Sequence, residues 1–208
     1  MALDLEEQDQ LDALKTWWKT YGSMVSTAVV VVAVCFAGYR GWEYYQHQQS
    51  VKASARYEAL GLVEKTDVKA IKSISSELME KYPSTPYAAR AAIAAAQSNY
   101  LAKDIKSAKA QLEWAVKNAK EETVKAVALL QLAALQAEEK EFDAALKTLG
   151  EQHDAGFDGL FADLKGDILA AQGKKADAKL AYQDALSKLD AQGKYHRYAE
   201  YTLEALGS

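Results

Sequence analysis

The chain has 208 residues, of which 50% are apolar, and its 25 Lys and Arg residues nearly balance its 29 Asp and Glu residues, for a formal net charge of -4. This balance argues against the basic surface that nucleic-acid binding requires, so we expect no nucleic-acid partner. The sequence holds one cysteine, which excludes a disulfide within the chain and a zinc site made of several thiolates.

Residues 1–19 form an acidic N-terminal segment. Its apolar residues Leu3, Leu11, Leu14 and Trp18 are spaced so that a helix would carry them on one side. The segment therefore predicts a disordered tail that ends in a short helix at a membrane surface.

The most apolar stretch follows directly, over residues 20–39, which contain no Asp, Glu, Lys, Arg or His. Twenty helical residues extend about 30 Å, roughly the hydrocarbon thickness of a bilayer. Aromatic side chains prefer the headgroup region, and they flank this stretch on both sides. They are Trp17, Trp18 and Tyr21 at its start, and Tyr39, Trp42, Tyr44 and Tyr45 at its end. The pattern predicts one transmembrane helix over residues 20–42, with the lipid bilayer as its surroundings.

Two other interpretations of this stretch remain open. Residues 29–32, all valine, resemble a buried strand when taken alone. A cleaved signal peptide would begin with a short basic region, whereas the segment that precedes this span is long and acidic. An uncleaved signal anchor is therefore the favoured interpretation.

The charges beside the span leave its orientation open. Lys15 and Lys19 lie on the N-terminal side, and Arg40, Lys52 and Arg56 lie on the other. Neither flank has the clear cationic excess that marks the cytoplasmic side.

Ala33, Ala37 and Gly41 recur at every fourth residue and would share one face of the predicted helix. Small residues let two membrane helices approach closely. They are also common in membrane helices generally, so this face is a candidate packing surface for a second helix.

Residues 43–208 are rich in Ala, Leu, Lys, Glu and Gln and contain no alternating β-type run, which predicts an all-α domain. A helix–turn–helix pattern recurs in it, with Ile71, Ala108, Ala145 and Ala178 at equivalent positions, 37, 37 and 33 residues apart. These intervals lie close to the tetratricopeptide period of about 34 residues, in which each repeat is a pair of helices.

Residue types at other repeat positions support this interpretation. In the last unit, Gly166 and Ala178 fall where the two helices cross closely, and Tyr182 falls at the aromatic position. Pro83 closes the first unit, but no unit has the full Trp-Leu-Gly signature. The repeats are divergent, and a plain helical bundle remains the alternative.

We therefore predict an all-α chain with one N-terminal transmembrane helix, a tetratricopeptide-like α-solenoid of about four helix pairs, and a C-terminal capping helix. The expected pairs are residues 50–65/67–81, 87–102/104–118, 121–138/141–149 and 160–172/174–190, with the cap at 193–206. The irregular segment 151–159 predicts either a bend in the stack or a loop that contacts a partner.

The sequence shows no catalytic or cofactor-binding motif. The three histidines are far apart, and the cysteine lies inside the apolar stretch. Neither a glycine-rich phosphate loop nor a Gly-x-Ser-x-Gly elbow is present. We therefore expect a non-enzymatic protein without catalytic residues, metal ligands or cofactors.

The concave side of such a solenoid is lined by the first helix of each pair. A mixed polar and apolar lining suits a peptide or a helix of another protein. The repeat register gives these candidate partner contacts: Arg56, Leu60, Arg90, Ile93, Gln97, Tyr100, Leu130, Asp163 and Asp167.

The order of features along the chain resembles the YfgM family, the ancillary subunits of the SecYEG translocon in Gram-negative bacterial inner membranes. The resemblance rests on the acidic tail, the Trp-Trp-Lys-Thr-Tyr-Gly start of the span at residues 17–22, its aromatic end at 39–42, and the divergent repeats. It covers nearly the whole chain and includes no catalytic motif.

The resemblance implies a cytoplasmic N-terminus, a periplasmic repeat domain, and association with the SecYEG translocon and the membrane-anchored periplasmic chaperone PpiD. It implies help in passing translocating client proteins to periplasmic chaperones. It also implies a link to envelope stress signalling through the response regulator RcsB. The alternative function is a membrane-anchored scaffold that faces the cytoplasm and sequesters a response regulator.

Overall fold

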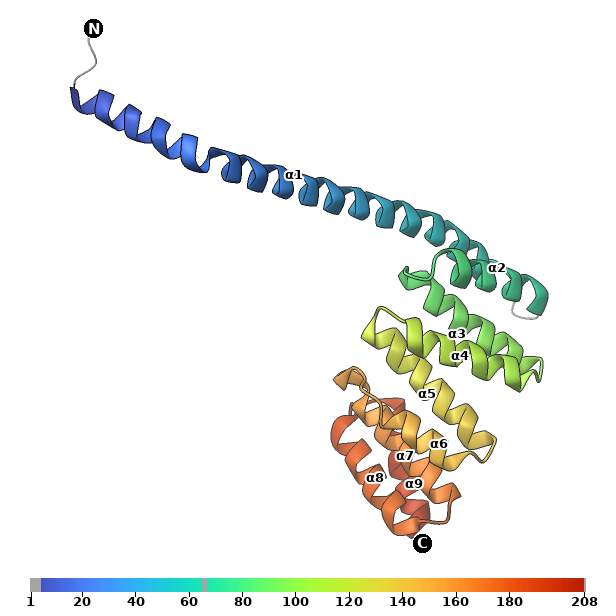
Figure 1. Cartoon of the computed structure of the whole chain (residues 1–208). Coiled ribbons are helices and arrows are strands. Elements are labelled where there is room, and N and C mark those ends of the chain that lie inside the picture. Colours follow the sequence, from blue (N-terminus) through green and yellow to red (C-terminus); the bar gives the residue numbers. More distant parts are fainter. Residues whose placement is uncertain (1–4, 65–66, 208) are drawn as a thin grey trace. The chain divides into compact units, whose positions relative to one another are not determined.

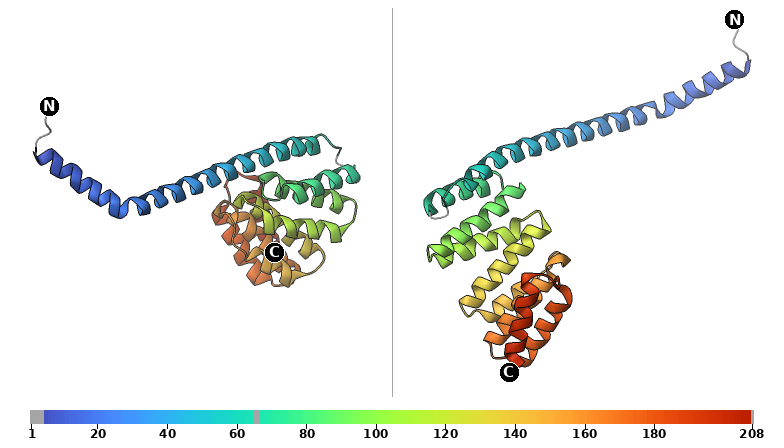
Figure 2. Two further views of the ribbon diagram at one scale, coloured as in Figure 1. Left: turned by 45° about the horizontal axis from the view of Figure 1, so that its top comes forward. Right: turned by 180° about the vertical axis from the view of Figure 1, so that it is seen from behind.

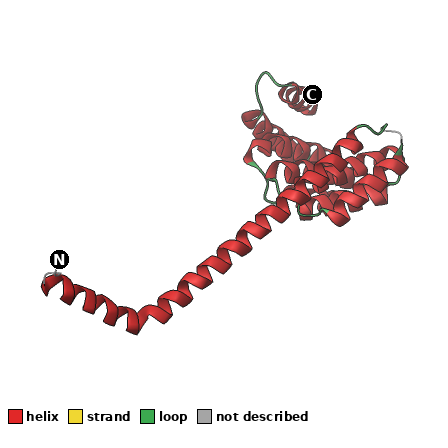
Figure 3. Ribbon diagram, turned by 90° about the horizontal axis from the view of Figure 1, so that it is seen from above, coloured by secondary structure: helices red, strands yellow, loops and turns green. Residues whose placement is uncertain are grey.

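The structure, a computed structural model, describes residues 5–64 and 67–207. Across these residues all regular secondary structure is helical, without a strand (Figure 3), which confirms the all-α prediction. The elements are α1 (Leu5–Gly61), α2 (Val68–Lys81), α3 (Pro86–Leu101), α4 (Ile105–Asn118), α5 (Glu122–Glu138), α6 (Phe142–Leu149), the 3-10 turn η1 (Ala155–Phe157), α7 (Asp158–Ala171), α8 (Lys175–Lys188) and α9 (Lys194–Gly207) (Figure 1). The chain divides into two compact units, Met1–Gln48 and Gln49–Ser208.

The first unit is the N-terminal part of α1, which is helical from Leu5 onward. The predicted helix at the end of this segment is therefore present, but it begins at Leu5, earlier than expected for a short helix. Its place at a membrane surface stays a prediction, and residues 1–4 lie outside the described part. Good helix formers fill this segment, and local contacts support it. Lys15 Nζ lies 2.9 Å from Asp12 Oδ1, and Thr16 Oγ1 donates to the Asp12 carbonyl oxygen at 2.8 Å.

The predicted span lies within α1, which is the one helix of the described chain that is long and apolar enough to cross a membrane. Its apolar side chains point outward, since Val30, Val32 and Phe36 are 60%, 67% and 65% exposed. In water, each Å² of such surface would cost about 25 cal/mol relative to an apolar environment. This helix therefore has the surface that a lipid-embedded segment requires.

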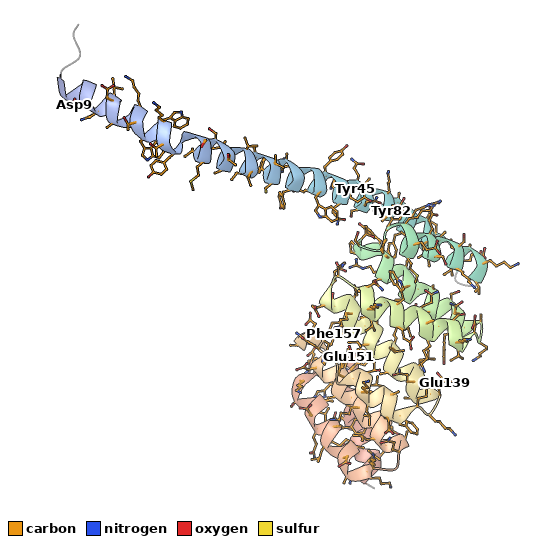
Figure 4. All side chains as sticks on the ribbon, in the orientation of Figure 1. Asp9, Tyr45, Tyr82, Glu139, Glu151 and Phe157 are labelled. Atoms are coloured by element: carbon orange, nitrogen blue, oxygen red, sulfur yellow. The ribbon has the colours of Figure 1, made fainter. Side chains whose placement is uncertain are left out.

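Aromatic clusters mark both ends of the apolar stretch, as predicted. The rings of Trp17 and Tyr21 are 5.8 Å apart between centroids, and those of Trp42 and Tyr45 are 6.1 Å apart. Tyr45, which belongs to the second cluster, is labelled in Figure 4. Two such clusters suit the two headgroup regions of a bilayer.

The second unit contains the predicted helix pairs, stacked in chain order (Figure 2). The last part of α1 pairs with α2 through a cluster that includes Ala53, Leu60, Ile71 and Leu78. We call the end of α1 and helices α3, α5 and α7 the A helices, and α2, α4, α6 and α8 the B helices. Helix α9 packs on α8 through Ala199, where the capping helix was expected.

Two details of the first pair differ from the prediction. Its A helix does not begin near residue 50, because α1 continues through that point from the apolar stretch. It also ends at Gly61 rather than at residue 65, because the Leu62 and Val63 amides turn back to the carbonyl groups of Ala59 and Leu60. Thr66, part of the first repeat motif, lies outside the described residues.

The turns that join the A and B helices of the last three pairs share one backbone geometry. At the equivalent positions Lys103, Lys140 and Gly173, φ is 64°, 62° and 77°, which is the left-handed region. Each turn closes with a hydrogen bond from the following amide to the carbonyl five residues earlier, the pattern of a Schellman cap. These bonds join Asp104 to Asn99 (2.9 Å), Glu141 to Gln136 (2.8 Å) and Lys174 to Leu169 (2.9 Å). The repeated geometry confirms the repeats that the spacing predicted.

Close packing between the helices of the last pair confirms the predicted roles of Gly166 and Tyr182. A Cβ atom on Gly166 would lie 2.6 Å from the Tyr182 ring, closer than a carbon atom allows. Ala178 and Ala185 are fully buried beside them. Small residues are therefore required at this crossing.

The apolar core runs from pair to pair instead of closing within each one. Leu129 of α5, Ala145 of α6 and Phe161 of α7 belong to one buried cluster. A second cluster joins Ala96 of α3, Leu112 of α4 and Leu132 of α5. Each pair therefore completes the core of its neighbour, as expected of a solenoid.

The irregular segment before α7 packs against the domain. The His153 ring stacks on Phe161, with centroids 3.5 Å apart and planes 7° from parallel. Asp154 Oδ1 accepts a hydrogen bond from the Gly156 amide at 2.8 Å, which fixes the turn between the labelled residues Glu151 and Phe157 in Figure 4. The structure thus gives this segment contacts within its own domain.

The left-handed turns yield a stability prediction. Lys140→Gly should raise the melting temperature by about 1–4 °C, because a side chain at positive φ costs about 1 kcal/mol that glycine avoids. Gly173→Lys should lower it by a similar amount. The control Lys72→Gly, at an exposed position inside α2, should be destabilising, since glycine costs about 1 kcal/mol in a helix interior. Thermal unfolding followed by circular dichroism measures all three, and a destabilised Lys140→Gly variant would contradict the turn assignment.

Candidate partner-binding groove

An apolar cavity of about 670 Å³ lies in the second unit, where the A helices of the first three pairs end. We call it the groove. Leu60, Leu101 and Leu135 line it from α1, α3 and α5, and Leu112 lines it from α4. Its size falls within the range of about 300–1,000 Å³ typical of ligand pockets. The groove is therefore large enough to receive several apolar side chains of a partner.

Equivalent repeat positions create the groove. Leu60, Gln97 and Ala134 line it and follow one another at the 37-residue repeat interval. Leu101 and Glu138 form a second such set, one turn further along their helices. Stacked repeats bring equivalent positions to the same edge, so residues far apart in the sequence converge here.

The polar part of the groove is built around Tyr100 and Glu138. The Tyr100 hydroxyl donates to the Glu138 carboxylate, with distances of 2.8 Å and 3.0 Å to its two oxygens. This hydrogen bond, together with the negative charge of Glu138, raises the pKa of Tyr100. The Lys103 ammonium lies 5.7 Å from the centre of the Tyr100 ring.

Three of the nine predicted contact residues, Leu60, Gln97 and Tyr100, line this groove. Sequence reasoning missed Leu101, Ala134 and Glu138. The repeat interval would have found Ala134, because it lies 37 residues after Gln97.

Arg56 and Arg90, also predicted contacts, instead form ion pairs within the chain. Arg56 Nη2 lies 2.8 Å from Glu77 Oε2, and Arg90 Nη2 lies 2.6 Å from Glu121 Oε2. A hydrogen bond from Lys81 and the positive charge of Arg56 lower the pKa of Glu77. These pairs are partly exposed, so each is worth at most about 1 kcal/mol.

Ile93 and Leu130 are half-buried and pack against the core clusters. Ile93 lies against the cluster that contains Leu112, and Leu130 lies against the one that contains Leu129. Their contacts therefore support the stack, and neither side chain lines the groove.

Asp163 and Asp167 lie together on α7, away from the groove. Asp163 is only 7% exposed, and its Oδ1 atom has no hydrogen-bond partner among the described residues. Burial, with a smaller contribution from the charge of Asp167, raises the pKa of Asp163 to about 6. Burial also raises the pKa of Asp167, against the effect of the hydrogen bond that the Tyr182 hydroxyl donates to it at 2.7 Å.

The predicted membrane packing face belongs to the first unit. Ala33, Ala37 and Gly41 are exposed on α1, and a Cβ atom on Gly41 would have no atom within 4 Å. Space for a second helix is therefore present along this face, and its use stays a prediction.

The described residues contain no group of three or more His, Cys, Asp or Glu side chains that could hold a metal ion. Of the histidines, His153 is engaged by the Phe161 stack, and its Nδ1 atom lies 2.8 Å from the Glu151 carbonyl oxygen.

The buried carboxyl of Asp163 yields a pH prediction. Its folded pKa of about 6 exceeds the ordinary 3.8, so its contribution to stability is complete below about pH 4 and is lost as the pH rises through 6. Asp163→Asn should therefore stabilise the protein at pH 7 by about 1–2 kcal/mol, and the gain should shrink toward zero near pH 4. Denaturant unfolding at the two pH values measures this. Glu113→Gln, on an exposed part of α4, is the control, and an equal effect of Asp163→Asn at both pH values would contradict the burial argument.

Comparison with known proteins agrees with the fold. The sequence model of the tetratricopeptide repeat-like domain family matches residues 15–208. Among curated proteins, the chain is 33% identical to the ancillary SecYEG translocon subunit of Neisseria gonorrhoeae, with 91% of each chain covered. It is 30% identical to the protein of the same name from Haemophilus influenzae (89% of this chain, 91% of the relative) and 31% identical to that of Escherichia coli (85% of each). The chain therefore belongs to the family of ancillary SecYEG translocon subunits, built on a tetratricopeptide repeat-like domain.

Proposed function

We propose that this protein is a non-enzymatic, single-pass subunit of the SecYEG translocon in the bacterial inner membrane, and that its repeat domain holds other proteins beside the translocon. The observation that carries the proposal is the apolar groove on a repeat domain attached to one membrane-length helix. Membership in the family of ancillary translocon subunits supports it.

The mechanism is tethering. A groove fixed to the membrane next to the translocon raises the effective concentration of whatever it binds, without any covalent step. The protein would thereby keep a chaperone close to client chains as they emerge. Membrane-anchored PpiD is the chaperone that the resemblance to the YfgM family suggests, and the clients are translocating secreted proteins.

In this proposal the N-terminal segment faces the cytoplasm and the repeat domain faces the periplasm. This topology is the one that the resemblance to the YfgM family implies. With this topology, a contact with the cytoplasmic regulator RcsB would involve residues 1–19 and leave the repeats free for periplasmic partners.

The topology is tested with a reporter fused after Ser208. A reporter that forms its disulfide only in the periplasm should be oxidised when fused to the full chain, because disulfides persist in that compartment and not in the cytoplasm. The same reporter fused to a cytoplasmic protein is the control. A reduced reporter would overturn the proposed topology and favour the cytoplasmic scaffold that sequesters a response regulator.

The role of the groove is tested by co-purification from crosslinked membranes. Ala134 lines the groove and is exposed, so Ala134→Arg should place a bulky charge in it without disturbing the fold. We expect at least a several-fold loss of PpiD recovered with the full chain. The matched control is Ala110→Arg, at an exposed position on α4 that does not line the groove. Equal recovery of the chaperone with both variants would remove the groove from the proposal.

A further inference from the structure

We propose that the groove selects a partner segment that is both apolar and basic, with Lys or Arg beside its aliphatic residues. This inference rests on the proposed function, because it names the chemistry of the partner that the groove receives. Two independent features of the groove lead to it, namely its apolar lining and the negative potential at one edge.

The lining requires an apolar partner. Leu101 lines the groove and is 67% exposed, although it follows directly on the buried helix face formed by Ala95, Ala96 and Asn99. Around it, Tyr57 and Val63 from the first pair extend the apolar surface. Exposed apolar surface that is continuous with a cavity is typical of an interaction site. Burying this apolar surface against a partner would contribute about 25 cal/mol of favourable free energy per Å² removed from water.

The C-termini of three A helices lie at one edge of the groove, and helix dipoles make such an edge electronegative. Gly61, Leu101 and Glu138 are the last residues of α1, α3 and α5, and all three line the groove. Each helix C-terminus carries a partial negative charge of about half an electron. Three such ends at one edge favour a cation there.

Glu138 adds a full negative charge that is already held in place. The Tyr100 hydroxyl donates to both of its oxygens, which orients the carboxylate before any partner binds. A carboxylate has further lone pairs, so it can accept from a Lys or Arg of a partner while it keeps this hydrogen bond. The groove therefore offers a pre-oriented acceptor beside an apolar surface.

Other partner chemistries fit less well. The described residues that line the groove include no Lys, Arg or His, so an acidic segment or a C-terminal carboxylate would meet no positive charge in it. Lys103 is exposed, with its ammonium 5.7 Å from the centre of the Tyr100 ring, and it is not among the residues that line the groove. The described part of the chain also has no strand, so an extended peptide has no sheet edge with which to pair.

The test uses the full chain in lipid nanodiscs of uncharged phosphatidylcholine and three fluorescent peptides of equal length. The peptides share their leucines and differ only at the polar positions, which are all Lys, all Glu or all Gln. Fluorescence anisotropy, corrected with empty nanodiscs, gives the affinities. We expect the Lys peptide to bind about tenfold more tightly than the Glu peptide, with the Gln peptide between them.

Charge variants at Glu138 assign the preference to this residue. Glu138→Gln should weaken the binding of the Lys peptide by about two- to fivefold. Glu138→Lys should abolish or reverse the affinity ranking of the three peptides. Glu200→Lys, an exposed site on α9 outside the groove, is the control and should leave the ranking intact. Circular dichroism confirms that each variant keeps its helices.

The outcomes separate this inference from the proposed function. Equal binding of the three peptides, binding of none of them, or a ranking that survives Glu138→Lys would overturn the inference. The proposed function would still stand if Ala134→Arg reduced chaperone recovery. Conversely, if Ala134→Arg blocked the Lys peptide but left chaperone recovery unchanged, the chemistry of the groove would hold and the proposed role of the groove would fall.

Discussion

The repeat domain depends on one constraint, which is that no helix pair can bury its own apolar faces. Phe161 of α7 is buried against α5 and α6, with the His153 ring stacked on it, and Leu112 of α4 packs with Leu132 of the next A helix. Close approach within a pair adds to this cover, as at the crossing of Gly166 of α7 and Tyr182 of α8. Contacts between neighbouring pairs therefore contribute to stability together with those within each pair, as is typical of solenoids.

The same constraint produces the groove. Because the pairs stack in register, the ends of three A helices meet at one edge, and their equivalent positions lie next to one another. No single repeat contains the groove, which exists only where three repeats have stacked. The proposed tethering role would gain from this arrangement, because the surface is fixed by the fold and would need little ordering when a partner arrives.

The sequence predicted the architecture well because the periodic signals were local and repeated. Ile71, Ala108, Ala145 and Ala178 gave the repeat interval, and the helices agreed with the expected ranges to within a few residues in the last three pairs. A short helix at the end of the N-terminal segment was predicted, but its start as early as Leu5 was missed, because acidic composition suggested disorder while local helix propensity and the contacts of Asp12 favoured order.

The site was only partly predictable from the sequence. Assigning a residue to the concave face does not show whether that residue is already paired with another side chain of the same chain. Arg56 and Arg90 belong to A helices, yet Glu77 and Glu121 engage them. Leu60, Gln97 and Tyr100 line the groove, whereas Ile93 and Leu130 pack into the core, although Ala94 and Gln131, the next residues along the chain, line the groove. That distinction depends on which side of its helix each residue occupies, which the repeat interval alone does not give.

The position of α9 has a consequence for how the domain comes apart. This helix is held at the end of the stack by Ala199, Leu203 and Leu206, and the neighbouring pair carries the buried carboxyl of Asp163 beside the half-buried Asp167. Local opening in a linear array begins at the end with the fewest neighbours and the least favourable burial. Proteases should therefore nick this protein first near its C-terminus, and the resulting fragment should keep the first three pairs and, with them, an intact groove.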